Sequence, residues 1–199
     1  MKYYLDITLL PNAEANLGFL WQKVYQQIHL ALVENKIAKN ESAIAVSFPN
    51  YKDKEFPLGD KVRLFADEEK LLKQLNIEKW LSRLSDYTHL KPIKTVPETV
   101  NQFARFKRKQ FKSNLLKEAK RRAEYKNESL DTALEHFKHY ETKNSLPYIN
   151  MTSLSMDKGS PAISNRHFKL IIDREILEEP EQGAFDCYGL SKTASIPWF

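Results

Sequence analysis

The chain has 199 residues, of which 42% are apolar, with five glycines, nine prolines and a net charge of +5; this composition excludes a disordered or fibrous protein and fits one large or two small globular domains. Its single cysteine, Cys187, excludes an internal disulfide bond and suits a reducing compartment. The N-terminus does not resemble a signal peptide, and no apolar run reaches the roughly 18–20 residues that span a bilayer, so we expect a cytoplasmic protein without a membrane partner.

The first half of the chain predicts the element order β-α-β-β-α-β. Alternating apolar residues indicate strands, and apolar residues three to four apart indicate amphipathic helices. Asp67 is a candidate N-cap for the second helix. The expected strands lie at 3–10, 44–48, 61–65 and 93–96, and the expected helices at 17–33 and 67–84. This order is typical of the ferredoxin-like unit, which hosts many functions and predicts none by itself.

The second half begins with a strongly basic segment. Between Arg105 and Lys126 lie ten basic residues and two acids, a net charge of +8 against +5 for the whole chain, so the remaining residues sum to −3. Such a stripe on a mildly acidic body indicates a polyanion ligand, although a solvated helix face is the alternative. Helices are expected at 115–126 and 129–140, and strands at 148–152, 168–172 and 185–188.

We therefore predict an α+β fold with two domains. Residues 1–97 would form a ferredoxin-like domain, and residues 98–199 a C-terminal RNA-recognition domain with a basic helix and short antiparallel strands. The strands lack the interleaved aromatic motif of proteins that read single-stranded RNA on an open sheet. A basic helix suits the groove of a duplex or hairpin better, because its main work is to neutralise phosphates.

The histidines are the first candidates for chemistry. His29 lies in the last turns of the 17–33 helix beside Ile28 and Leu32, where a lone histidine is more often structural than catalytic. His136 and His139 are three residues apart on a predicted helix, but no cysteine or further histidine clusters with them. We expect no metal site and no cofactor.

Short motifs along the whole chain match one known family in the right order. They are Tyr4-Leu-Asp-Ile7, His29, Val46-Ser-Phe-Pro49, Arg108-Lys-Gln110-Phe-Lys112-Ser-Asn114, Ser153-Leu-Ser155, His167-Phe168, Cys187-Tyr188-Gly189-Leu190-Ser191-Lys192 and Ile196-Pro-Trp-Phe199. The C-terminal motifs are the most specific. Together they resemble the CRISPR-RNA-processing endoribonuclease family of type I-F systems.

The resemblance implies metal-independent cutting at the 3′ base of the CRISPR repeat hairpin. The 2′-OH before the cut would attack the adjacent phosphorus, giving a 2′,3′-cyclic phosphate and a 5′-OH. By the same resemblance, His29 is the acid/base residue, Ser153 positions the attacking ribose and Tyr188 orients His29. An imidazole can move protons near neutral pH, and a serine hydroxyl can hydrogen-bond a ribose oxygen.

The resemblance also implies the RNA contacts. Arg108 would read a guanine and Gln110 an adenine in the stem, pairings that match the donors and acceptors of those bases. Phe168 would stack on the terminal base pair, although a core strand residue is an equally good interpretation. The other expected RNA-binding residues are Lys112, Lys117, Lys120, Arg121, Arg122 and Ser155. The family's groove helix is richer in arginine than this one, and Arg105 offers a competing register for Arg108.

Partners follow from the resemblance as well. The enzyme would stay on its product hairpin and join the other subunits of a type I-F surveillance complex. Two alternatives are a catalytically silent hairpin-binding subunit of such a complex and a basic DNA-binding protein.

Overall fold

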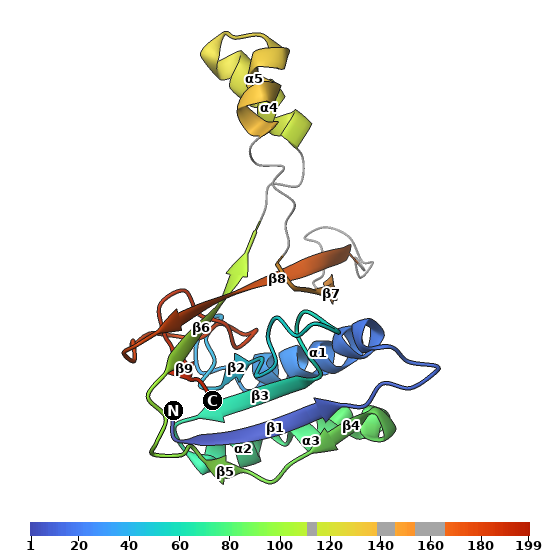
Figure 1. Cartoon of the computed structure of the whole chain (residues 1–199), viewed down its shortest axis with the longest axis vertical. Helices are drawn as coiled ribbons and strands as arrows, with labels where there is room; N and C mark the ends of the chain where they lie inside the picture. The colour runs from blue at the N-terminus through green and yellow to red at the C-terminus, as the bar shows by residue number, and fades with distance from the viewer. Residues whose placement is uncertain (111–114, 139–145, 154–165) are drawn as a thin grey trace. The chain divides into compact units, whose positions relative to one another are not determined.

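The computed structural model describes residues 1–110, 115–138, 146–153 and 166–199 (Figure 1). It contains two antiparallel sheets and several helices, which confirms the predicted α+β class. Contacts divide the chain into two compact units, residues 1–108 with 147–199 and residues 109–146. This division differs from the expected boundary at residue 97, because strands from the second half of the chain pack with the first half. The RNA-recognition role of residues 98–199 stays a prediction.

The first sheet has the strand order β2-β3-β1-β4, and each neighbouring pair is antiparallel. Its strands are β1 (Tyr3–Leu9), β2 (Ala45–Ser47), β3 (Lys61–Ala66) and β4 (Thr88–Leu90), and β5 (Lys94–Thr95) also pairs with β1. The fourth strand predicted at 93–96 corresponds to β5, which lies beside the start of β1. The structure adds β4 beside the end of β1, and this strand was not predicted.

Helix α1 (Leu17–Glu34) confirms the predicted amphipathic helix. Asn16 caps it, because its side-chain oxygen accepts the Phe19 N–H at 3.0 Å. The second predicted helix is interrupted. Asn76 adopts a left-handed conformation with φ 46°, which separates α2 (Glu69–Leu75) from α3 (Ile77–Leu81), and a 3₁₀ helix (Ser82–Tyr87) follows. Asparagine tolerates this conformation better than most residues.

The second sheet has the order β7-β8-β6-β9. Its strands are β6 (Phe103–Lys109), β7 (Tyr148–Ser153), β8 (Arg166–Leu177) and β9 (Ile196–Pro197). Strand β6 was not expected from the sequence, because it contains four basic residues. The strand predicted at 185–188 is wrong, since the chain makes a turn there, apart from one isolated bridge between Phe185 and Ser42.

One continuous apolar core joins both sheets to α1. Phe48, which follows β2, meets Phe106 of β6 edge to face with 5.2 Å between ring centroids. The indole N–H of Trp21 donates to the Gly59 carbonyl at 2.8 Å, so the largest side chain of α1 is buried without losing its hydrogen bond. This shared core makes α1 a rigid support for side chains on its exposed turns.

The second unit contains α4 (Leu115–Lys126) and α5 (Leu130–Lys138). Asn127, with φ 51°, ends α4, and the Glu128 N–H donates to the Ala123 carbonyl at 3.1 Å. The small side chains of Ala119 and Ala133 are fully buried, which lets the two helices approach closely. None of the helices in the described ranges is long and apolar enough to cross a membrane.

Candidate active site

The imidazole of His29 stacks on the phenol ring of Tyr188. The ring centroids are 4.1 Å apart and the ring planes differ by 2°. His29 comes from α1, whose neighbouring residues Tyr25, Ile28 and Leu32 are fully buried, so its backbone is fixed by the core. The structure thus brings together two of the three residues expected at the reaction centre.

A backbone hydrogen bond fixes the protonation of this histidine. Nδ1 of His29 lies 2.8 Å from the carbonyl oxygen of Cys187. Because a carbonyl oxygen can only accept, Nδ1 must carry the hydrogen in this bond. Nε2 is then the nitrogen that can take up a proton.

Burial and charge set the basicity of His29. Burial lowers its pKa from the ordinary value of 6.5, and the positive charge of Arg108 lowers it further. The hydrogen bond to Cys187 and the carboxylate of Asp186 act in the opposite direction. The net result is a lowered pKa, so the imidazole is neutral at neutral pH and Nε2 can act as a base.

Tyr188 is held by a tight turn that sequence reasoning missed. One carboxylate oxygen of Asp186 accepts the N–H groups of Tyr188 at 2.8 Å and of Leu190 at 3.1 Å. Gly189 has φ 70°, and a Cβ there would lie 2.3 Å from a methyl group of Val46. Only glycine fits both the backbone and the space. The pattern Asp-x-x-Gly at 186–189 is a turn signal that could have been recognised.

Further contacts join this turn to the core. The Tyr25 hydroxyl donates to the Tyr188 carbonyl at 2.7 Å, and the Val46 N–H donates to the Gly189 carbonyl at 2.8 Å. Burial raises the pKa of Asp186, and two backbone hydrogen bonds and the charge of Arg108 partly oppose that rise. The turn therefore places a carboxylate, a carbonyl and an aromatic ring around one histidine.

Arg108 and Phe168 complete the cluster. The guanidinium carbon of Arg108 lies 5.4 Å from the ring centroids of both Phe168 and Tyr188. Its Nε is buried and bonds to no atom within the described residues. Phe168, on β8, is partly buried and packs against the core. Four of the residues singled out from the sequence thus meet, although up to 159 positions separate them.

Ser153 is the last described residue of β7 and pairs with Arg166. The preceding residue, Thr152, donates its N–H to the side-chain oxygen of Gln26 at 3.2 Å. Gln26 lies three residues before His29 on α1, which is about one helical turn. This contact brings the end of β7 beside the part of α1 that carries His29.

The remaining expected RNA-binding residues fall in different parts of the chain. Gln110 is exposed just after β6. Lys120 and Arg121 are exposed on α4, and Arg122 forms an ion pair with Glu128 at 2.6 Å. Lys117 lies on α4 with its side chain outside the described part. Lys112 and Ser155 lie outside the described residues altogether.

The competing register through Arg105 is disfavoured. Arg105 is only 8% exposed, and its guanidinium pairs with Glu175 at 3.0 Å and with Glu181. Lys107 also binds Glu175, at 2.6 Å, and this contact lowers the pKa of Glu175. These two cations are neutralised inside the protein, so they are poorly placed to hold a polyanion.

No three histidine, cysteine, aspartate or glutamate side chains gather as metal ligands would within the part of the chain that the structure describes. The arrangement around His29 is one for proton transfer: a base nitrogen of fixed tautomer, an aromatic support and a nearby guanidinium. Such groups can move a proton to or from a reacting oxygen.

Known proteins resemble this chain along its whole length. Residues 4–199 match the family described as "CRISPR-associated protein (Cas_Csy4)". Proteins named "CRISPR-associated endonuclease Cas6/Csy4" from Escherichia coli (strain UTI89 / UPEC) and Pseudomonas aeruginosa (strain UCBPP-PA14) are 33% and 30% identical, each over 100% of both chains. A solved structure described as "An RAMP protein binding different RNA substrates" aligns over 98% of this chain and 99% of its own, with 13% identity and a TM-score of 0.34, too low to bear on the fold.

Proposed function

Because the chain belongs to the Cas_Csy4 family of CRISPR-associated proteins, we propose that it is an endoribonuclease that cuts CRISPR RNA at the 3′ base of the repeat hairpin. The observation that carries the proposal is the fixed imidazole of His29, stacked on Tyr188 and bonded through Nδ1 to the Cys187 carbonyl. The two relatives are named as endonucleases of the same kind and match this chain from end to end.

In the proposed reaction no metal takes part. Nε2 of His29 accepts the proton of the 2′-OH as that oxygen forms a bond to the adjacent phosphorus. The bond from phosphorus to the 5′-oxygen breaks, and this oxygen takes the proton from the imidazolium, directly or through water, to become a 5′-OH, which restores the neutral imidazole. The other product is a 2′,3′-cyclic phosphate. A neutral imidazole suits the first step, because Nδ1 carries the hydrogen and Nε2 is free to accept the proton of the 2′-OH.

We assign Ser153 to the attacking ribose and Tyr188 to the orientation of His29. The bond between Thr152 and Gln26 supports the first assignment, because it brings the end of β7 beside α1. The stack supports the second, since a ring that lies flat on the imidazole limits its rotation. A positioned hydroxyl contributes by holding the ribose oxygen in line for attack.

Recognition of the hairpin is assigned to the second half of the chain. Arg108 would read a guanine, because a guanidinium can donate two parallel hydrogen bonds to O6 and N7 of that base. Gln110 would read an adenine and Phe168 would cap the terminal base pair. The cations of α4, including Lys120 and Arg121, would hold phosphates without regard to sequence.

We also propose a ferredoxin-like arrangement for the N-terminal part. The antiparallel order β2-β3-β1-β4 with helices after β1 and β3 supports it. After cutting, the protein would keep its product hairpin and join a surveillance complex with other subunits. A cytoplasmic location fits these partners.

One gel separates this function from its alternatives. RNA carrying the host's repeat hairpin is incubated with the protein in excess chelator. The proposal expects RNA cut at the 3′ base of the stem. Bound but intact RNA would identify a silent hairpin-binding subunit, and equal binding of the same sequence as DNA and RNA would identify a general nucleic-acid binder.

A further inference from the structure

A basic groove runs between α1 and the α3 region, outside the cluster around His29. The hollow has a volume of about 720 Å³. Lys23, Gln26 and Glu34 of α1 line one side, and Lys79, Trp80 and Arg83 line the other. Three cations and a single carboxylate thus line this hollow.

The cations of this groove are available to a ligand. Among the described residues no carboxylate forms an ion pair with Lys23, Lys79 or Arg83. The ammonium group of Lys23 lies 5.3 Å from the centroid of the Phe19 ring. By contrast, lysines on α2 are already paired, as Lys73 is with Glu69 at 2.9 Å. Unpaired cations around a hollow attract a polyanion.

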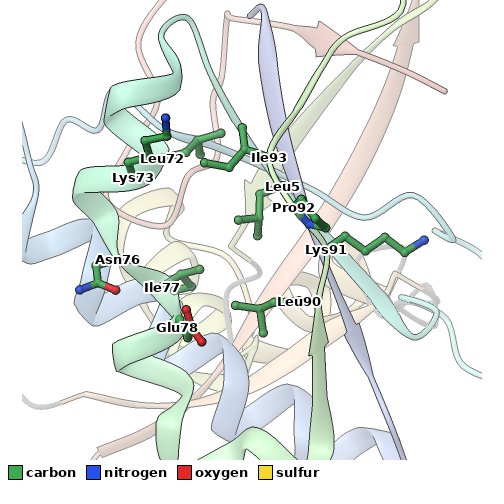
Figure 2. A pocket seen from close by; sticks show the side chains of 10 residues that line it. All are labelled: Leu5, Leu72, Lys73, Asn76, Ile77, Glu78, Leu90, Lys91, Pro92 and Ile93. Atoms are coloured by element: carbon green, nitrogen blue, oxygen red, sulfur yellow. The ribbon is translucent and has the colours of Figure 1, made fainter.

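A second hollow lacks these features. It has a volume of about 350 Å³ and lies between α2, α3 and the β4–β5 connection (Figure 2). Its walls include Leu72, Ile77 and Leu90, and one of its two lysines is the paired Lys73. Nothing in the described structure indicates what would cover it, but its exposed Lys91 can serve in a control variant.

Gln26 connects the basic groove to the candidate active site. This side chain lines the groove and also accepts the Thr152 N–H. Ser153 follows Thr152, and His29 lies one turn further along α1. An RNA strand that leaves the reacting phosphate is therefore close to the groove.

We propose that this groove binds the single-stranded RNA that continues 3′ from the cut. The inference rests on the proposed function, because that function places the reacting phosphate at His29. Lys23, Lys79 and Arg83 neutralise phosphates, and the partly exposed Trp80 offers a ring on which a base of any sequence can stack. A cationic groove with an aromatic ring is the usual combination for binding a single strand.

The test uses a hairpin made uncleavable by 2′-deoxyribose at the nucleotide before the cut. Its affinity is measured without a 3′ extension and with one of about ten nucleotides, within the usual range for single-strand sites. For the wild type the extension should tighten binding several-fold, and this gain should shrink as salt rises. Lys79→Ala with Arg83→Ala should remove the gain and leave affinity for the bare hairpin unchanged.

Lys91→Ala with Lys94→Ala is the matched control. Lys91, in the β4–β5 connection, and Lys94, on β5, are both exposed and do not line the groove, so their loss should leave the gain intact. The inference is overturned if the extension adds nothing for the wild type, if the same extension placed 5′ gives the whole gain, or if both double variants lose it equally. Cutting of the all-ribose bare hairpin, measured in parallel, reports on the proposed function independently.

Discussion

The imidazole of His29 lies flat against the ring of Tyr188, with 4.1 Å between centroids and 2° between planes. The edge of the same imidazole is bonded to the carbonyl of Cys187, the residue before Tyr188. Rotation of the histidine side chain would break both contacts together. The proposed acid/base group is thus oriented before RNA binds, which would remove an ordering step from the reaction.

The stack predicts how Tyr188 substitutions behave. Tyr188→Leu removes the ring and should lower the single-turnover cutting rate by ~10²-fold, the usual cost of a lost positioning group. Hairpin affinity should stay within a few-fold. Tyr188→Phe keeps the ring and should cut at close to the wild-type rate. If the phenylalanine variant folds yet is as slow as the leucine variant, the hydroxyl, not the stack, carries the effect.

Replacing Asp186 should shift the pH–rate profile of cutting, which the loss of a purely structural residue would not do. Its carboxylate raises the pKa of His29, so Asp186→Asn should lower that pKa. Since the neutral imidazole is the proposed base, the acid limb of the pH–rate profile should move to lower pH. Asparagine retains a side-chain oxygen for the Tyr188 and Leu190 N–H groups, so the turn is kept. An unchanged profile would show that only the turn matters.

Gly189→Ala tests whether the turn must have this shape. Residue 189 has φ 70°, and an added Cβ would lie 2.3 Å from a Val46 methyl group and 2.9 Å from its backbone nitrogen. The left-handed backbone alone costs about 1–2 kcal/mol, so chemical denaturation should show at least that loss. Gly18→Ala in α1 is the control, since its Cβ would have 3.3 Å to its nearest neighbour. Equal effects from both would refute the requirement.

Elements of the fold could be predicted from the sequence where neighbouring residues form a regular apolar pattern. The apolar spacing that predicts α1 is repeated every three to four residues, and burial on one face is enough to form it. Buried apolar residues continue through Leu72, Leu75, Ile77 and Leu81, and only the two-residue step from Leu75 to Ile77 departs from this spacing at Asn76. Only the left-handed backbone of one asparagine separates the two helices.

Ion pairs between residues far apart in the chain could not be predicted from the sequence. Strand β6 is predicted poorly because Arg105 points into the protein, and its partners Glu175 and Glu181 lie at least 70 positions away. The hydrogen bond between His29 and the Cys187 carbonyl depends on backbone geometry, which the side-chain types alone do not predict. His29 was identified through the resemblance, since its own surroundings on α1 are those of a structural histidine.

Arg108 and Arg121 should differ in what they recognise. A base contact discriminates by roughly 1–3 kcal/mol, whereas a phosphate contact is blind to sequence and weakens with salt. Arg108→Ala should flatten discrimination between the repeat hairpin and one with its last base pair inverted. Arg121→Ala should weaken both hairpins alike and reduce the salt slope by about one phosphate's share.

The control for this pair is Arg122→Ala, because Arg122 is already paired with Glu128 and should contribute less to the salt slope than the exposed Arg121. If Arg108→Ala weakens both hairpins equally, the assignment of Arg108 to a base is wrong. Arg105 is then no substitute, because its guanidinium is occupied by Glu175 and Glu181.

The central claim is that His29 carries out metal-independent cutting, and one measurement addresses it directly. Single-turnover cutting of the repeat hairpin RNA is followed in excess chelator for the wild type and for His29→Ala, with hairpin affinity measured for both. We predict that the wild type cuts and leaves a 2′,3′-cyclic phosphate, while His29→Ala binds within a few-fold of wild-type affinity and does not cut. Cutting by His29→Ala at the wild-type rate, or loss of wild-type cutting in chelator, would contradict the account.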